Sequence, residues 1–216
     1  KKKNSRGIDG WTAHELSSLP IQAISKITDF LNLNIQKTAN PHQSLISINP
    51  LLGKPNGTTR TICLTPVFYR IQCKIFQKEI RDWEDQHMQS FDTSKKGSSA
   101  LVAALSRNLA AEIAFFRGKQ SIAAFNDFFF VDTIFLPALI AQLKELSYPC
   151  IAACLALQQH VAPRLLKCQG FIGELTIVTN SVLAGCLHSV PFTRALLKDS
   201  IKEIVEQHAS IDTGLH

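Results

Sequence analysis

Residues 51–70 read LLGKPNGTTRTICLTPVFYR, and this stretch decides the fold of the chain around it. The Pro-Asn-Gly sequence at 55–57 is a strong turn signal, because proline presets the first central position and Asn-Gly accepts a positive φ. Apolar runs lie on both sides of it, at 46–52 and 62–64. The sequence therefore predicts a β-hairpin here, made of two short strands and a tight turn.

Two cations, Lys54 and Arg60, lie near the tip of the predicted hairpin. Fixed positive charges beside exposed backbone donors suit a polyphosphate, because it forms charge-assisted hydrogen bonds with both. Arg70 either extends this phosphate-binding wall or belongs to a solvated helix face. The alternative for the whole stretch is an ordinary exposed hairpin whose basic residues keep the chain soluble.

The composition is that of a folded protein with a large interior. The chain has 216 residues, of which 45% are hydrophobic and only 19% are charged. This length fits one large domain or two subdomains that share a core. The formal net charge of +6 favours anionic partners.

Cysteine spacing and hydropathy exclude several classes of protein. The six cysteines form no CxxC pair and have no histidine at zinc-ligand spacing, so they are expected to be reduced thiols of an intracellular protein, nuclear or cytoplasmic. No apolar segment follows the basic N-terminus, which argues against a secretory signal. Charged and polar residues interrupt every apolar stretch, so neither a membrane span nor a membrane partner is expected.

Periodicity and turn signals predict further helices and strands. Thr12 and Glu15 have the spacing of a capping box at the start of a helix. Helices are predicted over 21–34, 67–83, 100–116, 138–147, 150–161 and 192–208, and strands over 121–134 and 171–178.

Two carboxylates lie in the predicted strand 121–134, which reads SIAAFNDFFFVDTI. A carboxylate in a buried strand is costly unless it is paired or metal-bound. Asp127 and Asp132 are five positions apart, so they point to opposite faces and cannot share one metal. Asp132 fits the role of a helix cap, which leaves Asp127 as the candidate Mg²⁺ ligand.

Four stretches resemble, in the same order, motifs of reverse transcriptases of the non-LTR retroelement and group II intron kind. Residues 7–11, GIDGW, resemble the G-x-D-G opening of that family, and residues 54–70 resemble its fingers motif, K-x-x-G-x-x-R-P-I followed by Y-R. Residues 130–134, FVDTI, resemble the F-F-D-S-I end of the first palm motif. Residues 181–191, SVLAGCLHSVP, resemble G-V-L-Q-G-C-P-L-S-P. The pattern is similar to that of divergent retroelement-derived proteins of protists.

The resemblance implies an α+β fold, the fingers and part of the palm of a right-hand polymerase. Residues 1–119 would form a helix-rich fingers-like region with the hairpin, and residues 120–216 a partial palm with a small antiparallel sheet. The activity implied for the parent protein is RNA-directed DNA polymerisation, a nucleotidyl transfer with two Mg²⁺ ions. Its implied partners are an RNA template, a DNA primer and a dNTP.

The resemblance also implies residue roles. Lys54 and Arg60 would hold the triphosphate of the incoming nucleotide. The turn of Ala184, Gly185 and Cys186 would lie against the template and the nascent base pair.

The metal ligand implied by the resemblance is less simple. Asp132 matches the second aspartate of the first palm motif, and the ligand should then lie six residues earlier, at Asn126. Either the strand is one residue shorter and Asp127 binds Mg²⁺, or the ligand has become Asn126 and the site is impaired, because an amide lacks the charge of a carboxylate.

Departures from the family pattern leave two readings open. The family needs two adjacent aspartates after the Gly185 motif, and the 216 residues contain no such pair. The first reading is therefore a fragment that ends before this motif and the thumb and is inactive alone. The second is a degenerate, non-catalytic descendant that binds RNA or protein, suggested by Thr61 for proline, Ala184 for glutamine and Asn126. A helical scaffold with chance matches ranks last.

Overall fold

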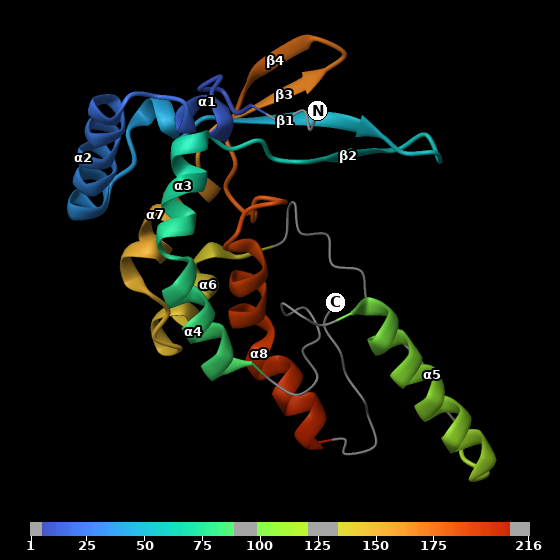
Figure 1. Ribbon diagram of the computed structural model, residues 1–216. Coiled ribbons are helices and arrows are strands. Elements are labelled where there is room, and N and C mark those ends of the chain that lie inside the picture. Colours follow the sequence, from blue (N-terminus) through green and yellow to red (C-terminus); the bar gives the residue numbers. More distant parts are fainter. Residues whose placement is uncertain (1–5, 89–98, 121–133, 208–216) are drawn as a thin grey trace. The chain divides into compact units, whose positions relative to one another are not determined.

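The computed structural model describes residues 6–88, 99–120 and 134–207 (Figure 1). The chain divides into two compact units, Lys1–Asp85 with Phe130–Leu196, and Gln86–Phe129 with Leu197–His216. It is a mixed α+β protein, as the sequence predicts. The division into a fingers-like and a palm-like region at 119/120 stays a prediction.

The elements of the described residues are, in chain order, α1 (Ala13–Ser17), α2 (Ile21–Lys37), the 3₁₀ turn η1 (His42–Ser44), β1 (Ser47–Gly53), β2 (Thr59–Thr61), α3 (Val67–Ile75), α4 (Gln77–His87), α5 (Ala100–Phe116), α6 (Leu136–Glu145), α7 (Cys150–His160), β3 (Arg164–Cys168), β4 (Phe171–Thr176) and α8 (Ser189–Gln207).

The strands of the first unit form one sheet in the order β2-β1-β3-β4. β1 pairs antiparallel with β2 and parallel with β3, and β3 pairs antiparallel with β4. The expectation of a purely antiparallel sheet is therefore wrong for the β1–β3 pair. A long connection that includes α3, α4, α6 and α7 joins these two strands, and parallel pairing requires such a crossover.

The core of the first unit is a layer of helices. Phe76, Ile80 and Trp83 from the α3–α4 segment pack with Leu139 of α6 and Phe192 of α8. The indole Nε1 of Trp83 donates a hydrogen bond of 2.7 Å to the carbonyl oxygen of Leu146, so its one polar atom is satisfied inside the core. The alanines of α7 that face this layer are Ala152, Ala153 and Ala156.

Most predicted helices are confirmed, with one correction. The capping box of Thr12 and Glu15 is present at the start of α1, and α5 spans the predicted residues. The helix predicted over 67–83 is two helices, α3 and α4, which meet at Phe76. Phe76, Ile80 and Trp83 have i, i+4, i+7 spacing, so all three face the same core.

The second unit contains α5, several of whose large apolar side chains, among them Leu101, Phe115 and Phe116, are exposed. Of the helices described, none combines the length and the apolar character that crossing a bilayer requires.

Candidate functional site

The predicted hairpin is confirmed, and its turn is held by backbone hydrogen bonds. The amide of Lys54 donates to the carbonyl of Thr58 at 2.7 Å, and the amide of Gly57 donates to the carbonyl of Lys54 at 3.0 Å. Gly57 has a φ of +79°, which a glycine adopts without strain. Leu52 lies opposite Arg60.

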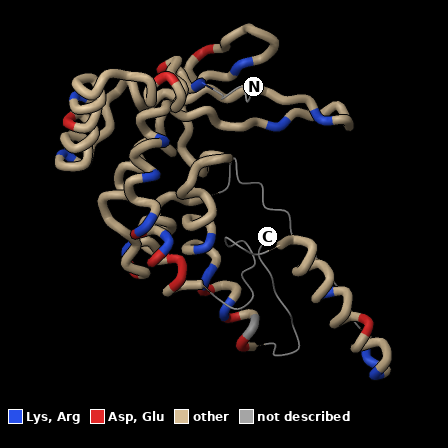
Figure 2. The backbone as a smooth tube through the Cα atoms, viewed as in Figure 1, with Lys and Arg blue, Asp and Glu red and all other residues tan. Residues whose placement is uncertain are grey.

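Lys54 and Arg60 are both exposed, as the sequence predicts for the hairpin tip. Figure 2 shows these cations on the projecting part of the hairpin formed by β1 and β2, where the neighbouring residues carry no charge. The described hairpin therefore presents two positive charges to solvent with no ion pair of their own.

The turn around Gly185 lies against the base of this hairpin. The amide of Cys63, just after β2, donates a hydrogen bond of 3.1 Å to the carbonyl oxygen of Ala184. A Cβ atom added to Gly185 would lie 3.8 Å from Cγ2 of Ile62, which is van der Waals contact. Ala184 and Gly185 are exposed and Cys186 is half-buried. The structure thus brings together two of the stretches on which the resemblance rests.

Side chains from two elements, β3 and α7, hold the first half of this turn. Arg164 of β3 donates through Nη2 to Ser181 Oγ at 2.6 Å, and to the carbonyl of His160 at 2.9 Å. The imidazole of His160, fully buried at the end of α7, accepts a hydrogen bond of 3.4 Å from the amide of Leu183. Buried hydrogen bonds of this kind favour a single conformation of the loop.

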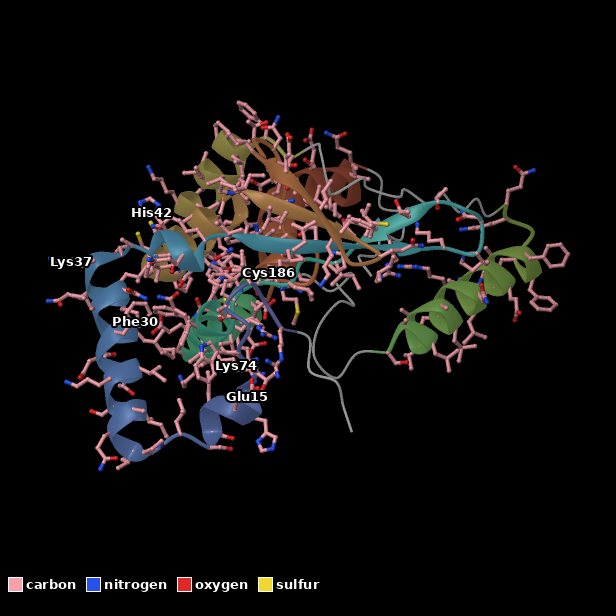
Figure 3. The ribbon with its side chains drawn as sticks, turned by 90° about the horizontal axis from the view of Figure 1, so that it is seen from above. Glu15, Phe30, Lys37, His42, Lys74 and Cys186 are labelled. Atoms are coloured by element: carbon pink, nitrogen blue, oxygen red, sulfur yellow. The ribbon has the colours of Figure 1, made fainter. Side chains whose placement is uncertain are left out.

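The second half of the turn is held from α3 and from the segment before α7. The hydroxyl of Tyr69 lies 3.1 Å from Cys186 Sγ, and the hydroxyl of Tyr148 lies 2.9 Å from Nδ1 of His188. Figure 3 shows Cys186 beside α3, with Lys74 further along the same helix. The turn is therefore a platform held by these contacts, and its exposed residues Ala184 and Gly185 carry no more than a methyl group.

Burial shifts the pKa values of the groups beneath the turn. Burial lowers the pKa of His188 to about 4, so its imidazole is neutral at physiological pH. Burial raises the pKa of Tyr148, which keeps its hydroxyl protonated. Burial also raises the pKa of the Cys63 thiol.

The G-x-D-G stretch docks on the segment that leaves the hairpin. Asp9 Oδ2 accepts a hydrogen bond of 2.5 Å from the amide of Val67, the first residue of α3. A Cβ atom added to Gly7 would lie 2.5 Å from the carbonyl oxygen of Thr65 and 2.8 Å from Cα of Pro66, so only glycine fits there. A third stretch of the resemblance thus contacts the end of the 54–70 stretch.

The cations of residues 67–83 are divided between α3 and α4. Lys74 is exposed and Arg70 is half-buried. Lys78 forms an exposed ion pair of 2.8 Å with Asp82, which is a solvated contact. Of the two cations of α3, Lys74 is therefore the exposed one.

Asp127, Asn126 and Asp132 lie outside the described residues, so the predicted Mg²⁺ ligand stays a prediction. Within the described ranges, no group of three or more histidine, cysteine, aspartate or glutamate side chains is placed to hold a metal ion.

No protein-family model matches this chain, and no curated protein sequence matches it significantly. The resemblance to reverse transcriptases, which the four short stretches suggest, stays a prediction.

Sequence reasoning missed the residues that hold the turn from below: Tyr148, His160 and Arg164. Each acts through a partner in a different element, so no local spacing marks it. Tyr69 carried a weak signal, because it belongs to the Y-R end of the fingers motif.

Proposed function

We propose that this chain is the fingers and part of the palm of a reverse-transcriptase-like protein, and that it binds a nucleotide and nucleic acid at the hairpin and the Gly185 turn. One observation carries this proposal. The base of the hairpin and the turn are in direct contact, through the hydrogen bond from the Cys63 amide to the Ala184 carbonyl.

The geometry supports different roles for the hairpin and the Gly185 turn. Lys54 and Arg60 offer exposed, unpaired charge to the phosphates of a nucleotide or a nucleic-acid strand. Ala184 and Gly185 carry almost no side chain, so a base pair or a backbone can approach the turn closely. The hydrogen bonds beneath the turn hold it in place before the ligand arrives, which lowers the cost of binding.

Magnesium enters the proposal through Asp127. When bound, Mg²⁺ would neutralise the phosphate charge and orient the reacting groups. A polymerase of this class also needs an adjacent aspartate pair, and the 216 residues contain none. The chain alone is therefore proposed to bind substrates without extending a primer.

A degenerate, non-catalytic descendant that binds RNA is the second candidate. It is favoured by Ala184, which is exposed at the centre of the turn and offers a methyl group where the family has a hydrogen-bonding glutamine. The two candidates differ in nucleotide binding, because only the first needs a site for a dNTP with its metal.

The double variant Lys54→Ala/Arg60→Ala is expected to weaken RNA binding and to flatten its dependence on salt. Each phosphate contact that is lost should reduce the slope of log K against log salt by about 0.7 for a single strand. Fluorescence anisotropy with a labelled RNA, titrated at several salt concentrations, measures both. The matched control is Lys26→Ala/Lys37→Ala on α2, which removes the same charge from a distant helix; equal slopes for the two variants would contradict the proposed site.

Measuring dNTP binding in Mn²⁺ or Mg²⁺ separates the two candidate functions. The hairpin variant Lys54→Ala/Arg60→Ala and a separate variant, Asp127→Ala, are compared with wild type. The polymerase-derived candidate predicts metal-dependent dNTP binding that both Asp127→Ala and the hairpin variant weaken by about tenfold or more. Asp29→Ala on α2 is the control for Asp127. RNA binding without metal-dependent dNTP binding would select the degenerate descendant.

A further inference from the structure

Two cysteine thiols lie together beneath the Gly185 turn. Cys186 Sγ is 3.1 Å from the hydroxyl of Tyr69. Cys73 follows Tyr69 by one helical turn on α3 and therefore lies on the same face. The side chains of Cys73 and Cys186 are close enough for each to shift the pKa of the other. Two segments distant in sequence thus place a pair of thiols side by side.

The two thiols differ in access to solvent. Cys73 is buried, with 5% of its surface exposed, whereas Cys186 is half-buried and lies between the exposed Gly185 and Leu187. A small oxidant arriving from solvent therefore meets Cys186 before the buried Cys73.

A histidine lies close to the Cys186 side chain. Nδ1 of His160 accepts the hydrogen bond from the Leu183 amide, so a proton of the ring is carried on Nε2. Nε2 has no hydrogen-bond partner among the described residues, and the imidazole is near enough to Cys186 to lower the pKa of its thiol. A proton donor or positive charge near a sulfur stabilises its thiolate form.

The chemistry of the two thiols is correspondingly asymmetric. Burial raises the pKa of Cys186, but the neighbouring Cys73 and His160 outweigh this and bring the pKa below that of an ordinary thiol. The hydrogen bond to Cys186, together with burial, raises the pKa of Cys73. Cys186 is thus the thiol that more readily forms a nucleophilic thiolate, whereas Cys73 stays protonated.

We propose that Cys186 and Cys73 form a peroxide-responsive thiol–disulfide pair, in which Cys186 is oxidised first and Cys73 resolves it. This inference rests on the contacts of the two cysteines and not on the function proposed above. A disulfide here would join α3 covalently to the Gly185 turn and so change the freedom of the platform.

The steps balance with hydrogen peroxide as the oxidant. The Cys186 thiolate attacks one peroxide oxygen; an S–O bond forms, the O–O bond breaks, and the departing hydroxide takes up a proton as water. Cys73 then attacks the sulfenic sulfur; the S–S bond forms, the S–O bond breaks, and the hydroxyl leaves as water with the proton from Cys73. Two thiols are oxidised by two electrons, and one peroxide is reduced to two waters.

The test is disulfide mapping of the intact chain after treatment with stoichiometric hydrogen peroxide. Free thiols are blocked with N-ethylmaleimide, and the unreduced digest is analysed by mass spectrometry. The expected product is one linked peptide pair that contains Cys73 and Cys186, while Cys150 and Cys168 are recovered alkylated. Cys150 is an internal comparison, because it is an exposed cysteine that neighbours Cys154 on α7.

Three outcomes would overturn the proposal. If Cys186 is linked mainly to Cys63, whose backbone lies against the same turn, then Cys63 and not Cys73 is the resolving thiol. If Cys73 and Cys186 are both still alkylated at a dose that oxidises the exposed Cys168, neither thiol is unusually reactive and the proposal fails. If Cys186 becomes a sulfinic acid while Cys73 stays free, Cys73 does not resolve it.

A variant pair checks the order of events. Cys73→Ala should leave Cys186 as a sulfenic acid that dimedone traps, whereas the wild-type chain should give little adduct. Cys168→Ala, on the exposed part of β3, is the matched control and should form the Cys73–Cys186 bond as wild type does. Equal dimedone labelling of Cys186 in wild type and Cys73→Ala would count against the resolving role.

Discussion

Replacing Phe192 with alanine is expected to lower the free energy of unfolding by about 3–5 kcal/mol. The ring of Phe192 is fully buried. Its centroid lies 5.6 Å from that of Tyr148, 5.2 Å from that of His160 and 5.6 Å from that of His188. These are the side chains that hold the turn, so removing the ring leaves a cavity directly beneath the platform.

Chemical denaturation of wild type and Phe192→Ala measures this loss. Phe171→Ala is the matched control: the same substitution on β4, where 82% of the side chain is exposed, should change stability by no more than about 0.5 kcal/mol. A loss below about 1 kcal/mol for Phe192→Ala would mean that the ring does not fill the space described here.

Acidification is expected to destabilise the fold through His188. Burial lowers the pKa of this imidazole to about 4, whereas the unfolded chain has the ordinary value near 6.5. Between these two values the unfolded state binds more protons than the native state. Stability therefore falls as the pH drops from about 6.5 to about 4, and it is retained in full above that window. The total cost is about 3 kcal/mol, from 2.5 units at 1.36 kcal/mol each.

The contribution of His188 is isolated by comparing pH profiles. His188→Asn keeps a polar atom near the Tyr148 hydroxyl but does not titrate in this range, so its profile should be flatter than that of wild type between pH 6.5 and 4. The comparison concerns the slope, since the smaller side chain also lowers stability at every pH. His14→Asn on the exposed face of α1 should follow the wild-type curve. Parallel curves for wild type and His188→Asn would show that the imidazole is not buried and neutral.

Local sequence signals were sufficient for several elements. The hairpin follows from Pro55, Asn56 and Gly57, whose turn closes within a few residues. The end of α5 follows from Gly118, which has a φ of +67° and so ends the helix without strain. Each of these features depends on residues close together in the chain, and such features are visible in a sequence.

The rest of the fold depends on contacts between distant residues. β3, RLLKC, was not predicted, because the five residues lack the alternation of an independent strand and gain their structure by pairing with β1 and β4. The parallel pairing of β1 with β3 has no local signal either. The same holds for the break at Phe76, which a continuous apolar pattern on one helix face conceals.

The candidate site likewise has features that the sequence predicts and features that depend on long-range contacts. The order of the four stretches suggested that Lys54, Arg60 and the Gly185 turn act together. The hydrogen bond between Cys63 and Ala184, which joins them, is a long-range contact that no spacing predicts. The pair of Cys73 and Cys186 was equally hidden, because it needs both the face of α3 and the path of the turn.

The central claim is that the hairpin and the Gly185 turn form one binding surface for nucleic acid and nucleotide. Hydrogen–deuterium exchange of the chain, alone and saturated with an RNA–DNA primer-template, dNTP and Mg²⁺, tests it most directly. The account predicts slower exchange in peptides covering 51–62 and 183–187 together, with no change in peptides from α2. Protection in only one of the two segments, protection confined to other parts of the chain, or no saturable binding at all would contradict it.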